Sequence, residues 1–531
     1  MKHTSILLML IMMSGYSFAQ KPVLSEDFSF KIGEKYKRIK SLNSYYVASG
    51  DRLVAIKKGR SSMTIQRFSL EDLKEDVKKR QVIEDKGDFQ TVMNLGGKAV
   101  VFYTVKDKAF AQKISLTGII AEKPVLIGSD KENINNDVGF KSTYGFDAGG
   151  RINKFVFKKS FDGSKLLVLF RVKTADDTGD KIGISVYDTS LKLLWKRKVK
   201  LPYASKWLEN EDFAIDNEGS FYLTASVFNS GAEEKNKLDF TYRTEVFKIK
   251  ENPKDIIKSK ISLSGKSVMD AIIGLDKGGK IRVSGFYSDN ATKAEASGMF
   301  SAILDETGNV ASVVKSDIPA ETVQQYLLKR EERVNEGTQK DDDKKDFENL
   351  KVNNIVFNED GSIVLLGEQR YVESFTTSSS SGSRTTYKYF YRDVIASKLS
   401  SDGSVTWFHK LPKHQIGARG KRSMSYVNFT NSGKHYLFHI DDFTNLKRSF
   451  DEIPTRYFDG KKEFLYLTSY TINDATGEVI KEPILTGSDI RNSRLDHLEL
   501  YKAATLPNQD MIFEAYDGKK NNLLLKVSGV K

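Results

Sequence analysis

Four of the six histidines in this sequence lie close together: His409, His414, His435 and His439. Imidazole is the side chain best suited to binding a metal ion or moving a proton near neutral pH. On a strand, His435 and His439 would share one face, because side chains alternate. The spacing fits no defined ligand or catalytic motif. The four are therefore a candidate metal or acid–base group, and the alternative is that they are surface or half-buried strand residues.

A basic segment, residues 413–422 (KHQIGARGKR), follows the first of these histidines. Half of its residues carry a basic side chain: Lys413, His414, Arg419, Lys421 and Arg422. Its two glycines allow the backbone to approach a ligand closely. Such a loop could bind a carboxylate, a phosphate or an acidic sugar. The alternative is an ordinary cationic connection with solvated charges.

Three tyrosines alternate along a nearby stretch: Tyr387, Tyr389 and Tyr391. On a strand this spacing places all three rings on one face. If the face is exposed, the rings would form a platform for a sugar or a peptide. If it is buried, they pack between neighbouring sheets. The sequence leaves both interpretations open.

Motifs that would name a reaction are missing from the sequence. There is no G-x-S-x-G nucleophile elbow, and the chain contains no cysteine. The lack of cysteine excludes disulfides, thiolate metal sites and a cysteine nucleophile. The acidic residues at 341–343 and the turn at 359–361 do not fit the calcium-loop pattern. We therefore assign no catalytic residue, no metal and no cofactor.

Residues 1–19 have the pattern of a secretory signal peptide. Lys2 and His3 precede an apolar run at 6–13 (ILLMLIMM), and small residues at Ser17 and Ala19 form a cleavage site. The run is too short to span a bilayer, which takes about 20 apolar residues. The sequence therefore predicts a mature chain that begins near Gln20 and is exported to the periplasm or secreted.

The rest of the chain reads as short strands separated by Gly, Asn and Asp turns. Residues 352–411 show the unit best, since they contain two hairpins that each turn at Asp-Gly. Variants recur along the chain and predict a single all-β domain over 20–531, a β-propeller of four-stranded blades. We count eight blades, with seven as the alternative. The last repeat lacks an outer strand, which residues 23–32 could supply and so close the ring.

Two segments interrupt these repeats, and we treat 317–350 and 373–388 as insertions. The first contains a helical pattern at 320–335 followed by a charged loop, and the second is rich in Ser and Thr. The Ser/Thr-rich segment is either a long polar hairpin tip or a disordered loop. Trp195 and Trp407 fall at the same place in the outermost strands of two repeats, which predicts equivalent packing between blades.

The formal net charge is +13, from 83 Lys and Arg against 70 Asp and Glu. The basic residues are scattered rather than clustered, which indicates a solvated lysine-rich surface and argues against nucleic acid as a partner.

The sequence resembles exported β-propeller proteins of Gram-negative bacteria. The resemblance rests on the signal peptide and on the repeated Asp-Gly-Ser hairpins at 161–164 and 359–362. The sequence differs from WD-type repeats because it lacks their regular Gly-His and Trp-Asp pairs. It implies an architecture and carries over no catalytic residue. We expect a monomeric, non-catalytic binding or scaffold protein that recognises a protein or glycan through one face. The alternative is a propeller enzyme that acts on a carbohydrate with carboxylates near the ring centre.

Overall fold

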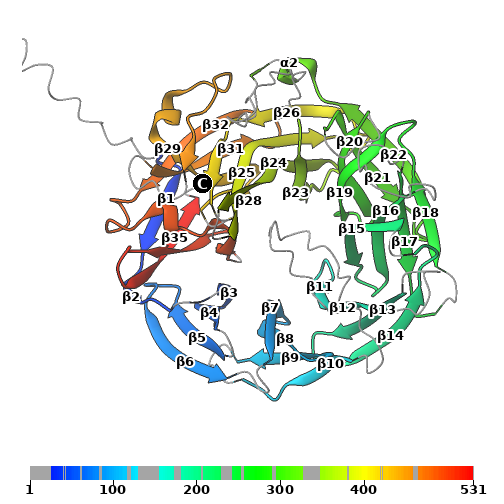
Figure 1. The fold of residues 1–531 in the computed structure, drawn as a ribbon, viewed down its shortest axis with the longest axis horizontal. Coiled ribbons are helices and arrows are strands. Elements are labelled where there is room, and N and C mark those ends of the chain that lie inside the picture. Colours follow the sequence, from blue (N-terminus) through cyan, green and yellow to red (C-terminus); the bar gives the residue numbers. More distant parts are fainter. Residues whose placement is uncertain are drawn as a thin grey trace, which may run out of the picture.

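Eight antiparallel sheets surround a central axis in the computed structural model, and each sheet forms one blade of a propeller (Figure 1). The predicted eight-bladed β-propeller is therefore confirmed. The structure describes residues 25–39, 41, 44–59, 62–82, 87–115, 121–129, 155–172, 181–204, 207–228, 242–252, 256–289, 295–323, 325–326, 347–379, 382–418, 420, 423–458, 465–506 and 508–529. The predicted signal peptide lies outside the described residues.

Each blade is a meander whose strands follow one another from the channel outward. The first four blades are β3 (Ser44–Ser49), β4 (Arg52–Lys58), β5 (Ser62–Ser69) and β6 (Glu75–Val82); β7 (Asp88–Leu95), β8 (Lys98–Val105), β9 (Lys108–Ile114) and β10 (Val125–Ser129); β11 (Phe155–Lys159), β12 (Lys165–Val172), β13 (Lys181–Asp188) and β14 (Leu193–Lys200); and β15 (Leu208–Ile215), β16 (Phe221–Phe228), β17 (Tyr242–Ile249) and β18 (Ile257–Ile261).

The second half of the ring repeats this order. Its blades are β19 (Ser267–Leu275), β20 (Ile281–Ser288), β21 (Gly298–Leu304) and β22 (Val310–Asp317); β23 (Leu350–Phe357), β24 (Ile363–Ser379), β25 (Gly382–Leu399) and β26 (Val405–Leu411); β28 (Val427–Asn431), β29 (Lys434–Asp442), β31 (Leu465–Asn473) and β32 (Val479–Thr486); and β33 (Ala504–Thr505), β34 (Met511–Tyr516), β35 (Asn521–Gly529) and β1 (Phe28–Ile32). The remaining elements are short: β2 (Tyr36–Lys37), α2 (Ala320–Val323), β27 (Gln415–Gly417), η3 (Phe443–Lys447), β30 (Tyr457–Phe458), η4 (Leu495–His497) and η5 (Leu500–Lys502).

The N-terminal segment closes the ring, as the sequence predicts. Strand β1 pairs antiparallel with β35 and is the outermost strand of the eighth blade. This pairing covers an edge that would otherwise be open. Beyond β1, Tyr36 of β2 and Lys57 of β4 both donate hydrogen bonds to the carboxylate of Glu514 in β34. The first blade, the N-terminal segment and the last blade therefore meet at one buried carboxylate.

Trp195 and Trp407 connect neighbouring blades, as the sequence predicts. Each lies in the outermost strand of its blade, and its indole N–H donates to a carbonyl of the next blade. The acceptors are Gly219 at 3.1 Å and Asp474 at 2.9 Å. A side chain at Gly477 would place its Cβ 2.6 Å from Cγ of Trp407, so the close approach requires glycine there.

The two insertions differ in what the structure describes of them. Of the predicted helix over 320–335, α2 is the described helical part, and residues 327–346 lie outside the described residues. Of the Ser/Thr-rich segment, residues 374–379 and 382–387 continue the β24–β25 ladder, up to the pair Ser379 and Gly382. The polar hairpin interpretation is therefore confirmed for these residues.

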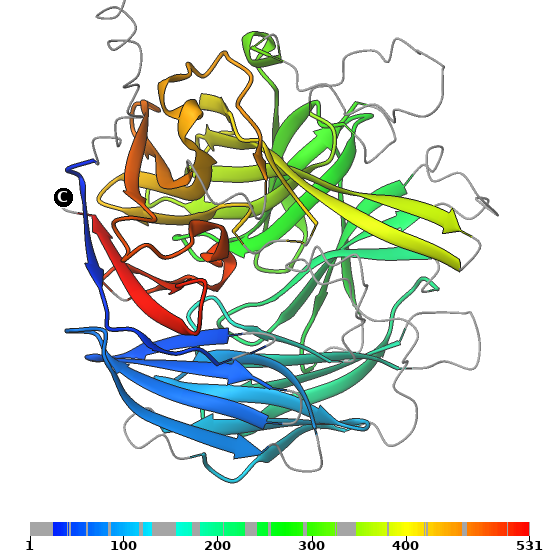
Figure 2. The same cartoon turned by 60° about the vertical axis from the view of Figure 1, so that its left-hand side comes forward.

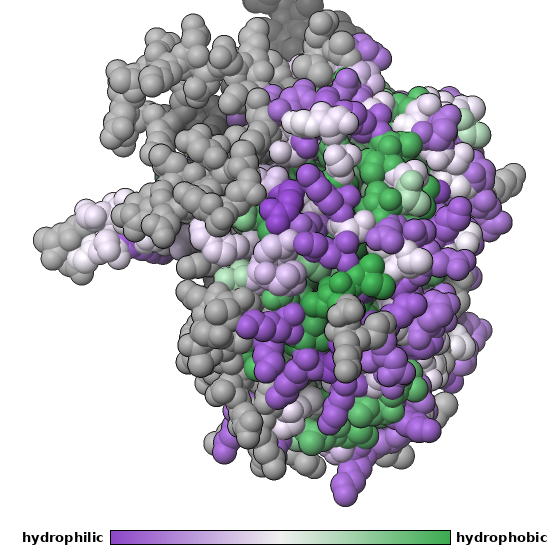
Figure 3. Space-filling view, turned by 90° about the vertical axis from the view of Figure 1, so that its right-hand side faces the viewer, coloured by the Kyte–Doolittle hydropathy of each residue, from purple (hydrophilic) through white to green (hydrophobic). Residues whose placement is uncertain are grey.

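The outer rim of the ring is polar. Hydrophilic residues cover much of the side shown in Figure 3, with smaller apolar areas between them. In β14 the lysines Lys196, Lys198 and Lys200 are exposed while Trp195 and Val199 point inward. No helix among the described residues is long and apolar enough to cross a membrane.

Candidate functional site

The two faces of the ring differ because of the meander. The turns between the first and second strands and between the third and fourth strands of a blade emerge on one face. The other two kinds of connection emerge on the opposite face, which we call the connection face. Among the described residues, the longer stretches on this face are 318–323, 412–418, 423–426, 443–458 and 487–503. Because loops carry binding residues more often than strands do, the connection face is the candidate functional surface.

The β24–β25 hairpin extends from this face. Both strands continue beyond their neighbours in the blade, since β23 pairs with β24 only up to Gln369 and β27 pairs with β25 only from Tyr389. Figure 2 shows the outer part of the hairpin projecting away from the ring. Side chains over 382–388 are exposed. The hairpin is therefore a ribbon with solvent on both faces.

The three alternating tyrosines lie along β25, but they do not form an exposed platform. Tyr387 is 41% exposed, whereas Tyr389 and Tyr391 are 7% and 0% exposed. The inner two belong to the apolar core between the last blades. The strand runs from solvent into the interior, so the platform interpretation holds for Tyr387 alone and the packing interpretation holds for the other two.

His409 and His435 both lie against Trp407. The His409 ring stacks on Trp407 with 5.5 Å between ring centroids, and the His435 ring lies 6.4 Å from the same indole. His435 Nε2 is 2.8 Å from Asp474 Oδ1. Burial lowers the pKa of both histidines, in His435 despite the opposing effect of Asp474. These two neutral rings therefore belong to the packing between blades.

His439 and His414 are also held neutral, at separate places. His439 stacks on Tyr470 with ring centroids 4.9 Å apart, and burial lowers its pKa to about 3 although Asp441 favours the charged form. Burial, followed by the charges of Arg392 and Lys413, lowers the pKa of His414 to about 4. Within the described ranges, no three His, Asp or Glu side chains are grouped so that they could hold a metal ion. The four histidines therefore do not converge on one site.

Lys413 is an interior residue rather than part of a mobile basic loop. Its Nζ lies 2.8 Å from Glu368 Oε1, and both side chains are fully buried. Its backbone N–H donates to Asp393 at 3.1 Å. Ser425 donates to the other oxygen of Glu368 at 2.7 Å. The start of the basic segment is thus fixed in the blade, which removes Lys413 from the candidate ligand-binding residues. The other three cations of the segment, Arg419, Lys421 and Arg422, lie outside the described residues.

Carboxylates on the innermost strands bridge neighbouring blades. Asp212 of β15 accepts a hydrogen bond from the backbone N–H of Ile273 at 3.1 Å and pairs with Lys158 at 3.0 Å. Asp270 of β19 accepts from the N–H of Val352 at 2.6 Å. In each case the N–H group that donates to the carboxylate belongs to the innermost strand of the following blade. These two carboxylates hold the ring together, and they lend no support to the alternative of a carbohydrate-cleaving enzyme.

No protein-family model matches the chain, and no curated protein sequence matches it. Among solved structures, the WD40 domain of SCAP from fission yeast is similar, with a TM-score of 0.39, 8% identity and 96% of each chain covered. A post-proline cleaving enzyme from Rickettsia typhi is also similar, with a TM-score of 0.36, 12% identity, and 90% of this chain and 58% of that chain covered.

An uncharacterised protein from Listeria monocytogenes EGD-e is a third similar structure, with a TM-score of 0.37, 9% identity, and 81% of this chain and 92% of that chain covered. The chain spans between 54% and 58% of the length of three similar peptidases. We draw no functional conclusion from similarity at this level. The propeller assignment rests on the strand pairing itself.

Proposed function

We propose that this is a non-catalytic binding protein of the periplasm or cell envelope that recognises a protein partner through its connection face. The observation that carries the proposal is the projecting β24–β25 hairpin. The outer part of the ribbon buries little against the blades, so the propeller does not need it for stability. A hairpin of this kind is marginal alone and serves recognition better than folding.

The hairpin has a stiffened base and an open outer part. At the base, the rings of Tyr371 and Phe390 stack with centroids 4.5 Å apart. Further out, Lys388 Nζ lies 5.1 Å from the ring centroid of Phe375, and Tyr387 is exposed beside them. These contacts order the ribbon before a partner arrives, which reduces the entropy lost on binding.

The edges of the ribbon favour a protein over a glycan. No strand of the described chain pairs with the outer edge of β24 beyond Gln369 or with that of β25 before Tyr389. Unpaired N–H and C=O groups along a strand edge are a template for an extended peptide. The exposed ring of Tyr387 would anchor an apolar side chain of that peptide. We therefore propose strand addition as the mode of recognition.

The proposed location rests on the sequence. A signal peptide over 1–19 would direct the chain out of the cytoplasm, and a chain without cysteine needs no disulfide for stability there.

A shortened hairpin tests the proposal. Residues 374–387 are replaced by Asn-Gly, which favours a tight two-residue turn and keeps the inner ladder. We expect the variant to keep the thermal midpoint of the parent to within about 4 °C and to lose a protein that the parent captures from a cell-envelope extract. The matched control is Asp51→Ala on the turn face, where the side chain is 78% exposed. Identical protein capture by parent and shortened variant, or capture of polysaccharide alone, would contradict the proposal.

A further inference from the structure

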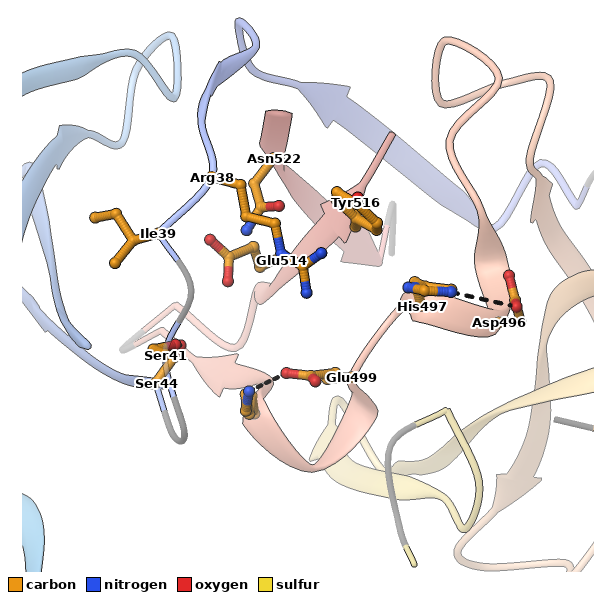
Figure 4. Close-up of a pocket in the computed structure, with 11 residues that line it drawn as sticks. Arg38, Ile39, Ser41, Ser44, Asp496, His497, Glu499, Glu514, Tyr516 and Asn522 are labelled. Carbon is orange, nitrogen blue, oxygen red and sulfur yellow. Dashed lines mark hydrogen bonds and ion pairs between the residues drawn. The ribbon is translucent and has the colours of Figure 1, made fainter. Parts of the chain in front are cut away.

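A polar pocket lies on the connection face where the last blade meets the first (Figure 4). Its volume is about 80 Å³. Space of this size holds several waters or part of a small polar ligand. The side chains that matter here are those of Arg38, His497, Glu499, Glu514, Tyr516 and Asn522.

Ring closure assembles this pocket from both ends of the chain. Arg38 follows β2, and its backbone N–H donates to the carbonyl of Lys520 at 2.9 Å. Its guanidinium carbon lies 3.9 Å from the centroid of the Tyr516 ring, a cation–π contact that fixes the side chain. Figure 4 shows the guanidinium directed into the pocket, with Glu514 and Asn522 beside it and His497 and Glu499 across from it.

The carboxylates of the pocket each have their own cation. The three pairs are Glu514 with Lys57, Glu499 with Lys502, and Asp496 with Arg494. The guanidinium of Arg38 makes no ion pair and no hydrogen bond with any described residue. Three carboxylates and two cations, Arg38 and Lys502, line the pocket. Each carboxylate is paired, and among the described residues Arg38 is the lining cation without a carboxylate partner.

An acceptor in the pocket also has no partner. Asn522 is 6% exposed, and its Oδ1 is buried without a hydrogen bond from any described group. A buried acceptor left unsatisfied is destabilising, and a ligand hydroxyl at this position would satisfy it. On another part of the lining, the hydroxyls of Ser41 and Ser44 lie 3.1 Å apart.

We propose that this pocket binds the carboxylate-bearing ring of an acidic sugar. The ligand carboxylate accepts paired hydrogen bonds from the Arg38 guanidinium, whose planar fork matches that geometry. A ligand hydroxyl donates to Oδ1 of Asn522. This binding involves neither the hairpin nor a protein partner, so its test is independent of the test of the proposed function.

Titration of the full-length protein with D-glucuronate tests the proposal, with D-glucose and acetate as reference ligands. Glucose has the same ring without the carboxylate, and acetate has the carboxylate without the ring. We expect saturable calorimetric binding of glucuronate and no measurable binding of the other two under the same conditions. Arg38→Gln should weaken glucuronate binding by about tenfold or more, and Asn522→Ala should weaken it less.

Lys37→Gln is the matched control, because Lys37 is an exposed cation next to Arg38 that does not line the pocket. It should leave the affinity unchanged. Arg38→Lys, which keeps the charge and loses the fork, separates a folding defect from lost recognition and should bind glucuronate with intermediate affinity. The proposal is overturned if glucose or acetate binds as tightly as glucuronate, if glucuronate does not bind, or if Arg38→Gln binds it like the parent.

Discussion

Lys57 and Glu514 form a largely buried ion pair, with side chains 1% and 11% exposed, across a sequence separation of 457 residues. Lys57 is in the first blade and Glu514 in the last. Tyr36 donates to the same carboxylate, so the N-terminal segment is held at this point too. Both residues of the pair lie at the junction where the two ends of the chain meet in the ring. This pair therefore holds the junction that the β1–β35 ladder closes.

Removing one partner of this pair should destabilise the protein strongly. Lys57→Met leaves the Glu514 charge buried and unpaired, which typically costs about 3–5 kcal/mol. Urea unfolding followed by tryptophan fluorescence measures the change. The control is Lys98→Met, which removes an exposed pair with Glu122 (side chains 50% and 46% exposed) and should cost no more than about 1 kcal/mol. Equal losses in the two variants would contradict the account.

The same pair predicts how stability depends on acid. Burial alone would raise the pKa of Glu514, but the charge and hydrogen bond of Lys57 outweigh it and hold the pKa at about 2, below the ordinary value of 4.5. Because the folded pKa is depressed, the stabilisation is complete above about pH 4.5 and is lost as the pH falls towards 2. Urea midpoints measured across this range should fall less in the Lys57→Met/Glu514→Leu double variant. A parallel fall in both proteins would show that Glu514 is not responsible.

His414 and His439 should not titrate near neutral pH. Burial lowers the pKa of His414 to about 4 and that of His439 to about 3, against about 6.5 in an unfolded chain. Their ring-proton NMR signals should stay constant between about pH 5.5 and 8, and addition of zinc should not shift them. In urea the same signals should titrate near pH 6.5. A folded-state midpoint near neutrality, or a zinc-induced shift, would restore the metal or acid–base interpretation.

Much of the fold followed from the sequence because local signals repeat. Strand alternation and Asp-Gly turns identified the eight blades, and the missing outer strand of the last repeat pointed to residues 23–32. The candidate site was harder to predict from the sequence, because the exposure of a side chain depends on tertiary packing. Tyr389 and Tyr391 look like Tyr387 in the sequence, and only the position where β25 enters the ring separates them. Lys413 looked like a solvent-facing cation, although its partner Glu368 lies on another strand.

The pocket at the closure was missed for a related reason. His497 is isolated in the sequence, and Arg38 lies among the lysines at 35, 37 and 40, so neither stood out as a binding residue. The predicted pairing of residues 23–32 with the last blade was the signal that could have found it. That pairing brings the segment after residue 32 next to residues 495–522. Which side chains converge there still depends on the turn between β34 and β35.

Lys413 and the cations after it should behave differently on substitution. Lys413→Met leaves Glu368 buried without its partner and should cost about 3–5 kcal/mol. Trp407→Ala, which removes an aromatic ring packed between two blades, should cost about the same. Arg419→Ala, in the basic segment, should change stability by no more than about 0.5 kcal/mol. Chemical denaturation of the three variants measures this, and a Lys413→Met protein as stable as Arg419→Ala would contradict the buried ion pair.

Site-specific photo-crosslinking in cells that express the protein tests most directly whether the hairpin binds a protein partner. A photoreactive residue is placed at Thr385 on the outer hairpin and, in a second protein, at Asp51 on the turn face. We expect a discrete crosslinked protein from Thr385 that is absent from Asp51 and is lost when the opposite strand of the hairpin carries Thr376→Pro. Crosslinking of the same partners from both positions, or none from Thr385, would contradict recognition through the connection face.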